Sequence, residues 1–366
     1  MIRDSMSSPS ISSDNVTAEG EAYLSAPQRL RFVAIDPPQN GQAIDVAPGV
    51  RWCRIPLPID LNHINVWLID HDDGCVAVDT GMAAPIGEEA WAALEAEVFR
   101  STPLRGVFVT HIHPDHIGLA RWLQQRYAVP VWMSPRTLEQ MQTFMGAEPD
   151  STAAEAERFF RLHGVVDRGL LPSLSPTRFL RMTSGMPEVG KTFVDRETVS
   201  WGAAQWQALE TNGHAEGHLC LHDAANGTLI SGDQVLPTIS SNIGFTWRSR
   251  DPNPLGSYLA SLERLHALPA DTLVLPSHGL PFRGLRARVE DLRAHHLEQL
   301  DAVMQACRAP SSALDILPVM FRRPLLGMHF LLAMAEALAH LEYLATGRRL
   351  ERAIDGAGVT RYVTSA

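Results

Sequence analysis

The chain has 366 residues, of which 45% are hydrophobic and 20% charged, and its formal net charge is −10. This length is enough for one large core and a smaller one, and the net acidity argues against nucleic acid as the main partner, because phosphate binding depends on clustered cations. The four cysteines, Cys53, Cys75, Cys220 and Cys307, are widely spaced and form no CxxC pair. They indicate reduced, buried thiols of an intracellular protein and exclude a disulfide framework.

The first 28 residues carry no recognisable targeting signal. Residues 1–28 are rich in serine, aspartate and glutamate and lack the apolar core of a signal peptide. We expect a disordered tail and a cytoplasmic protein. The apolar stretch nearest to membrane length, residues 325–345, contains two glutamates, Glu336 and Glu342. It therefore predicts a buried amphipathic helix, and we expect no membrane partner.

Two sets of short strands follow, separated by helices. Residues 49–55, 64–69 and 75–78 predict an antiparallel meander, with a hairpin-type turn at residues 72–74. Residues 85–99 and 117–127 predict helices on either side of the apolar strand 106–110. The second set of strands begins near residue 198 and continues through residues 206–209, 219–221, 228–230 and 272–275. Alternating strands and helices of this kind indicate a layered α/β fold.

The most informative motif is His111-Ile-His-Pro-Asp-His116, directly after the apolar run. Strand periodicity places His111 and His113 on one side, whereas Asp115 and His116 can share a site with them only if the chain turns sharply. Pro114 supplies that break. Imidazoles suit a borderline divalent metal, and a carboxylate among them indicates a second metal or a means of holding water.

Three more metal-type side chains follow short apolar runs further along the chain. His214 lies in Thr211-Asn-Gly-His-Ala-Glu-Gly-His218, Asp233 follows Leu229-Ile-Ser-Gly, and His278 follows Leu273-Val-Leu-Pro-Ser. Each can stand at the end of a strand where a loop begins. Such side chains converge on one edge of a sheet.

The order of these residues resembles the motif of the metallo-β-lactamase superfamily, which is an H-x-H-x-D-H loop followed by a lone His, a lone Asp and a last His. The turn Val76-Ala-Val-Asp79-Thr-Gly81 resembles the Asp-bearing turn of that family. The resemblance implies an αββα sandwich over roughly residues 45–285, with the metals at one edge. It also implies a first metal on His111, His113 and His214, a second on Asp115, His116 and His278, a bridging Asp233, and an Asp79 that orients a ligand imidazole.

The lone histidine departs from the family pattern. The family's Pro-Gly-His-Thr is Asn212-Gly-His-Ala215 here, and His218 offers a second candidate four residues on. We prefer His214 because it occupies the position after the glycine. Seven ligands are too many for one tetrahedral ion that must also keep a position open for water, so the set favours two divalent ions. Zinc is the favoured metal, with iron and manganese left open.

The chain divides into a catalytic domain, residues 29–285, and a carboxy-terminal module, residues 286–366. Residues 134–188 are an insertion that the sandwich does not need. We favour a helical lid or wall of the substrate pocket, and the alternative is helices that only pad the sandwich. Arg158, Arg161 and Arg168 within it are either receptors for an acidic substrate group or an ordinary solvated face.

The carboxy-terminal module reads as helix, helix, helix, hairpin, which is the order of a winged helix. It resembles the module of the hydroxyacylglutathione-hydrolase-like subgroup that includes β-lactamase-like protein 2. The third helix, residues 327–346, contains no lysine or arginine, whereas a groove-reading helix needs cations and donors. We therefore expect the module to pack on the catalytic domain, shape the pocket or form a homodimer.

Two metals that hold one water predict hydrolysis. They lower the pKa of bound water to about 7, so no serine or cysteine nucleophile is required. Asp115 is placed to accept a proton from the attacking hydroxide and to pass it to the leaving group. A small-molecule thioester or related small acyl ester is the favoured substrate. A lactonase, such as the acyl-homoserine lactone type, and a phosphodiesterase or ribonuclease remain the alternatives, because fold and metals alone do not choose among them.

Overall fold

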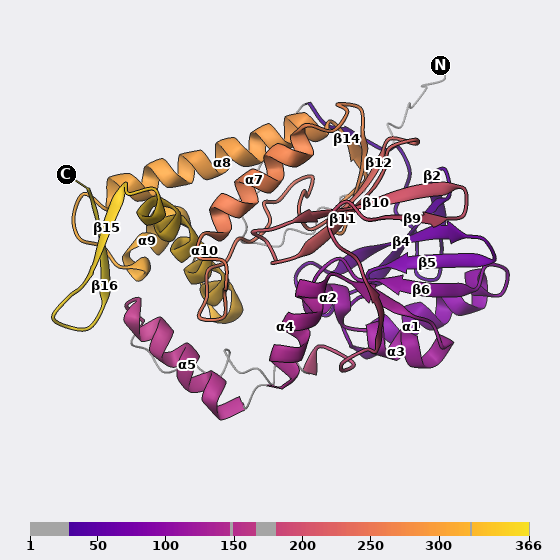
Figure 1. The fold of residues 1–366 in the computed structure, drawn as a ribbon, viewed down its shortest axis with the longest axis horizontal. Coiled ribbons are helices and arrows are strands. Elements are labelled where there is room, and N and C mark those ends of the chain that lie inside the picture. Colours follow the sequence, from indigo (N-terminus) through magenta and orange to yellow (C-terminus); the bar gives the residue numbers. More distant parts are fainter. Residues whose placement is uncertain (1–28, 147–148, 166–180, 323, 366) are drawn as a thin grey trace, which may run out of the picture.

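Two seven-stranded sheets pack face to face in the computed structural model, which describes residues 29–146, 149–165, 181–322 and 324–365 (Figure 1). The tail expected at residues 1–28 lies outside the described residues. Helices cover the outer faces of both sheets, so the chain adopts the mixed α/β sandwich that the strand pattern predicts. Within the described residues, no helix has both the length and the apolar character needed to cross a membrane.

The first sheet has the order β2-β3-β4-β5-β6-β7-β8. Its strands are β2 (Ile44–Ala47), β3 (Val50–Pro56), β4 (His63–His71), β5 (Gly74–Val78), β6 (Leu104–Phe108), β7 (Val131–Met133) and β8 (Val189–Thr192). β3, β4 and β5 pair antiparallel, which confirms the predicted meander, and the strands from β5 to β8 pair parallel.

The second sheet has the order β1-β14-β13-β12-β11-β10-β9. Its strands are β1 (Arg31–Phe32), β9 (Thr198–Trp201), β10 (Ala204–Thr211), β11 (His218–Asp223), β12 (Thr228–Gly232), β13 (Leu273–Pro276) and β14 (Phe282–Arg283). β12 and β13 pair parallel, and the other neighbours pair antiparallel. β10, β12 and β13 consequently all end at the same edge.

Short helices connect the strands of the first half. They are α1 (Pro85–Leu94), the π-helical turn Glu95–Phe99, α2 (Pro114–Ile117), α3 (Ala120–Tyr127), α4 (Pro135–Met145) and α5 (Pro149–Leu162). The predicted helix over residues 85–99 is thus α-helical only up to Leu94, and the one over residues 117–127 is interrupted at Gly118 and Leu119. α4 and α5 belong to the insertion predicted over residues 134–188.

The carboxy-terminal elements gather at one end of the molecule, away from the first sheet (Figure 1). They are α8 (Leu285–Ala306), α9 (Ala313–Met320), α10 (Gly327–Thr346) and the hairpin of β15 (Leu350–Ile354) and β16 (Thr360–Thr364), with α7 (Pro254–His266) alongside. The predicted order of three helices and a hairpin is present. Its classification as a winged helix stays a prediction.

Three hydrophobic clusters hold these layers together. The cluster between the sheets includes the large aromatic side chains Trp52, Trp67, Phe108 and Trp206. A second cluster joins the outer face of the first sheet to α1 and α3, and a third joins the outer face of the second sheet to α7, α8, α9 and α10. The module predicted over residues 286–366 therefore shares one continuous core with the second sheet.

Candidate metal centre

Every residue of the predicted ligand set lies just beyond a strand, at one edge of the sandwich. His111 and His113 follow β6, and His214 follows β10. Asp233 follows β12 and His278 follows β13. Because these strands all run toward the same edge, side chains more than a hundred residues apart meet there.

The turn inside the His111–His116 motif is a single helical turn. His113 has extended backbone and precedes α2, and Pro114 occupies the first helical position, where a missing N–H costs nothing. The backbone N–H of His116 donates to the carbonyl of His113 over 2.9 Å. The proline thus acts as a helix start, which brings Asp115 and His116 to the same edge as His111 and His113.

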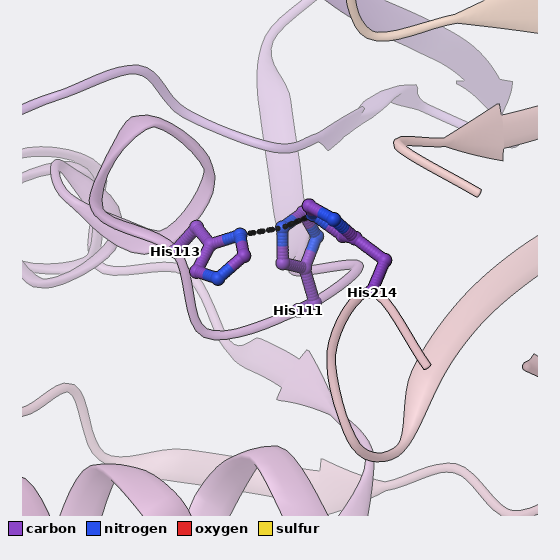
Figure 2. A group of neighbouring side chains, drawn as sticks. All are labelled: His111, His113 and His214. Atoms are coloured by element: carbon purple, nitrogen blue, oxygen red, sulfur yellow. Dashed lines mark hydrogen bonds between the residues drawn. The ribbon is translucent and has the colours of Figure 1, made fainter. Parts of the chain in front are cut away.

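Three imidazoles form the first group, His111, His113 and His214 (Figure 2). Nε2 of His111 lies 2.9 Å from Nδ1 of His113 and 3.2 Å from Nε2 of His214. His214 donates its Nδ1 proton to the carbonyl of Asn242 over 2.9 Å, so its Nε2 carries a lone pair toward the group. Ring nitrogens that face one another in this way are the arrangement that a shared cation satisfies.

Four residues form the second group, Asp115, His116, Asp233 and His278. Nε2 of His278 lies 3.3 Å from Oδ2 of Asp115 and 3.6 Å from Oδ1 of Asp233. Oδ2 of Asp233 lies 3.3 Å from Nε2 of His116 and 3.5 Å from Nε2 of His214. The Asp233 carboxylate is therefore between the two groups, which is where a bridging ligand must be.

Asp79 lies on the far side of the ligand imidazoles from the site and fixes the orientation of their rings. Its backbone has a φ of 66°, in the left-handed region that non-glycine residues rarely adopt, and its side chain is 1% exposed. It accepts from Nδ1 of His116 over 2.8 Å and from the backbone N–H of Thr110 over 2.8 Å. The Thr110 hydroxyl bonds both Asp79 and Nδ1 of His111. These contacts orient the Nε2 atoms of His111 and His116 toward the site, as the sequence predicts for Asp79.

The two groups differ in charge. Burial holds the pKa of His111 well below its usual value and lowers the pKa of His113 to about 3, so both rings are in the neutral form that binds metals. Burial also opposes protonation of His116, but the charges of Asp233, Asp115 and Asp79 outweigh it and raise its pKa well above the usual value. The second group therefore attracts cations strongly.

The residues fit two divalent ions. Nε2 of His116, Nε2 of His278 and Oδ1 of Asp233 are buried atoms without a hydrogen-bond partner. Buried polar atoms are rarely left this way unless a ligand or ion completes them. Five imidazoles and two carboxylates, one of which lies between the two groups, are a nitrogen and oxygen donor set that suits zinc, iron or manganese.

His218 makes different contacts from those of His214. It begins β11 and is fully buried. Its Nε2 accepts from the backbone N–H of Asp233 over 3.2 Å, and its Nδ1 lies 3.0 Å from the Thr211 hydroxyl. Gly232 permits this approach, because a Cβ there would lie 2.3 Å from Nε2 of His218. His218 therefore fixes the backbone of Asp233, whereas His214 points into the first group.

Asn65 is a positioning residue that sequence reasoning missed. It is fully buried in β4, and its amide donates to the carbonyls of Pro276 and Gly279 over 2.8 Å each. Its side-chain oxygen accepts from Trp52 over 2.8 Å, and its backbone N–H donates to Ser277. These bonds hold both sides of His278. The only available signal in the sequence is a polar residue inside an otherwise apolar strand.

A cavity of about 290 Å³ opens beside His113 and His214. α4 contributes Arg136 and Phe144 to its wall, and α10 contributes Leu332. The segments 112–113, 213–216 and 242–254 supply the lining residues outside these two helices. The insertion thus forms part of the pocket wall, as expected. Of the two alternatives for the lid arginines, the solvated face fits Arg158 and Arg161, because Arg161 pairs with Glu157 on α5 and both arginines line a separate hollow. Arg168 lies outside the described residues.

Residues 59–278 match the family model of the metallo-β-lactamase superfamily. The chain belongs to this superfamily. Residues 300–365 match a second model, the carboxy-terminal domain of metallo-β-lactamase-like proteins. A solved structure, that of a β-lactamase domain protein from Burkholderia ambifaria, superposes with a TM-score of 0.83 at 38% identity, over 94% of this chain and 99% of that one.

Three curated relatives of this superfamily protein carry functional names. The probable metallo-hydrolase YqjP of Bacillus subtilis is 27% identical over 80% of this chain and 90% of its own length. A hydroxyacylglutathione hydrolase of Aeromonas hydrophila is 27% identical over 60% of this chain and 63% of its own length. The human acyl-coenzyme A thioesterase MBLAC2 is 27% identical over 63% of this chain and 78% of its own length. The chain is thus a metallo-hydrolase of this superfamily.

Proposed function

We propose that this protein hydrolyses a small acyl thioester or a related ester with water activated by two divalent metal ions. The observation that carries the proposal is the position of Asp233, whose Oδ2 lies 3.3 Å from Nε2 of His116 and 3.5 Å from Nε2 of His214. A carboxylate between two ligand groups suits a site that holds two ions with one water. The names of two relatives, a hydroxyacylglutathione hydrolase and an acyl-coenzyme A thioesterase, support a thioester substrate.

The residues divide the chemistry between them. When bound, two divalent ions would lower the pKa of a water molecule to about 7 and polarise the attacked carbonyl oxygen. His111, His113 and His214 would hold the first ion, and Asp115, His116 and His278 the second, with Asp233 shared. Asp79 and the Asn242 carbonyl keep ligand rings in the tautomer that presents Nε2.

Asp115 accepts and then donates the proton in this mechanism. Its side chain lies within 3.3 Å of Nε2 of His278 and is 9% exposed as a residue, so it can hold a proton out of bulk solvent. As the water oxygen forms a bond to the acyl carbon, the C–S bond breaks, and Asp115 takes the proton and returns it to the leaving sulfur. The products are a carboxylic acid and a thiol.

The test is a substrate panel on protein with its metal content measured. We expect about two ions per chain and the highest kcat/KM on acyl-glutathione or acyl-coenzyme A thioesters, compared with homoserine lactones, a β-lactam and a phosphodiester reporter. A single ion per chain that Asp233→Ala leaves unchanged contradicts the two-ion site. A phosphodiester or lactone preferred over every thioester contradicts the substrate class.

A further inference from the structure

The cavity beside the first ligand group contains three arginines with unequal surroundings. Arg136 donates to Glu216 over 2.7 Å and pairs with Glu139 over 2.6 Å. Arg250 pairs with the other oxygen of Glu139 over 2.5 Å. The charges of these two arginines are therefore compensated by Glu216 and Glu139.

Arg248 forms no ion pair with an acid among the described residues, although Glu155 lies near enough for its charge to act on the guanidinium. Its Nη2 donates to the hydroxyl of Thr152 over 2.7 Å, and its guanidinium lies over the ring of Phe144 at 4.7 Å from the centroid. Its Nη1 is buried and lacks a hydrogen-bond acceptor. A half-buried cation with an unused donor is unfavourable unless a ligand completes it.

The backbone around Arg248 is held in place. The N–H of Ser249 donates to the carbonyl of Thr246 over 3.1 Å, and the N–H of Thr246 donates to the Ser249 hydroxyl over 3.0 Å. The same segment begins at Asn242, whose carbonyl accepts from His214. One ordered segment thus links the first ligand group to a cation on the wall of the same cavity, and such preorganisation favours binding.

We infer that Arg248 binds an anionic oxygen group, a carboxylate or a phosphate, on the substrate whose acyl carbon lies at the metal centre. This inference rests on the proposed function and narrows it to anionic thioesters or esters. Arginine suits such groups because its planar donors match two oxygens of one carboxylate or phosphate. The cavity's apolar side chains, Ile112, Phe144 and Leu332, would contact the uncharged part of the molecule.

The anion can belong to the acyl part or to the thiol part of a thioester. Four substrates separate these sources: the butyryl and glutaryl thioesters of N-acetylcysteamine, butyryl-glutathione and butyryl-coenzyme A. Of these, only butyryl-N-acetylcysteamine is neutral. A selective effect on the glutaryl compound assigns the acyl part, and one on the glutathione or coenzyme A compound assigns the thiol part.

The experiment compares wild-type protein with Arg248→Gln, Arg248→Lys and Arg161→Gln, each with metal content verified. We expect Arg248→Gln to raise KM for at least one anionic thioester by about tenfold to a hundredfold, the usual loss for one charge-assisted bond. Its kcat should stay within about twofold, and KM for the neutral thioester should not change. Arg248→Lys should recover part of the loss. Arg161→Gln removes an arginine outside this cavity and should leave every KM unchanged.

Equal effects of Arg248→Gln on neutral and anionic thioesters would overturn the inference and leave the proposed hydrolysis intact. If wild-type protein hydrolyses none of the thioesters, the proposed function fails, and calorimetry with the same four compounds decides the inference separately. Binding of an anionic compound that is lost in Arg248→Gln and kept in Arg161→Gln supports the anion site. If the anionic compound binds Arg248→Gln as tightly as wild-type protein, the anion site is excluded.

Discussion

At the scale of single residues, two histidines four positions apart have different contacts. His214 directs Nε2 at the first ligand group, and His218 uses both ring nitrogens for contacts inside the protein. The difference follows from local structure, because His214 stands in the loop after β10 and His218 begins β11. A histidine whose nitrogens are both occupied is not available to an ion.

We therefore expect His214→Ala to lose most bound metal and most activity, and His218→Ala to keep metal. His218→Ala leaves the Asp233 N–H buried without an acceptor, so its free energy of unfolding should fall by about 1 to 3 kcal/mol. Elemental analysis and thermal unfolding of both variants measure these effects, and His218→Gln, which retains an acceptor, serves as the control. Metal loss in His218→Ala with metal retained in His214→Ala would reassign the ligand.

A second prediction at this scale concerns Asp115. Asp115→Asn keeps the size of the side chain and one oxygen but cannot accept a proton. With metal restored to the wild-type content, we expect kcat to fall by about a hundredfold or more, which is the usual contribution of a general base, while KM changes little. Steady-state kinetics on the preferred thioester, with metal content measured on the same sample, checks it. Wild-type kcat at full metal content would remove Asp115 from proton transfer.

At the scale of elements, the two sheets meet at the metal centre through Asn65. β4 of the first sheet carries this side chain, and its amide donates to Pro276 at the end of β13 and to Gly279 in the following loop, on both sides of His278. Every hydrogen-bonding position of the amide is used, since its oxygen also accepts from Trp52 and Arg54. Fully paired buried polar groups hold their surroundings in one arrangement.

Asn65→Ala should therefore act on the second ligand group more than on the first. Four lost hydrogen bonds predict a decrease in the free energy of unfolding of about 2 to 4 kcal/mol, and His278 should become less well placed. We expect one of the two ions to be lost at a lower chelator concentration than in the wild type. Asn65→Asp keeps the acceptor and removes both donors. It therefore separates the effect of the bonds that the amide donates from the effect of those that it accepts. Equal loosening of both ions would indicate a general effect on folding.

At the scale of the whole molecule, the carboxy-terminal helices complete the core. Leu292 and Leu300 of α8 and Leu338 of α10 belong to the same hydrophobic cluster as Leu229 and Val274 of the second sheet. α10 also reaches the metal centre, because Glu336 accepts from the side chain of Asn242, whose carbonyl holds His214. The module therefore shares a hydrophobic core with the second sheet and contacts the residue whose carbonyl holds His214.

Truncation after Leu285 tests this role. Removal of residues 286–366 exposes the outer face of the second sheet, and we expect aggregation, or a monomer if the full chain proves to be a homodimer. Light scattering of the two proteins at equal concentration, with metal content as a second readout, provides the measurement. A monodisperse truncate that keeps its oligomeric state and both ions would contradict the assignment.

The sequence by itself determined the local features of this protein. The spacing within His111–His116 predicted a compact group of ligands, and periodicity predicted the meander, the helix over residues 327–346 and the terminal hairpin. These features depend on neighbours a few positions apart, so their information is local. The resemblance of the ligand motifs to those of the metallo-β-lactamase superfamily predicted the αββα sandwich and the family.

Only the tertiary structure decided which distant side chains meet. Asn65 and Pro276 are 211 positions apart, and nothing in either local pattern indicates their bond. Arg136, Arg248 and Arg250 line one cavity, and only the fold shows that Glu139 and Glu216 pair with the first and the last of them. His296 of α8 is fully buried, and its Nδ1 lies 3.2 Å from Nε2 of His340 of α10. In each case packing between elements sets the partner, and that depends on the whole fold rather than on the sequence nearby.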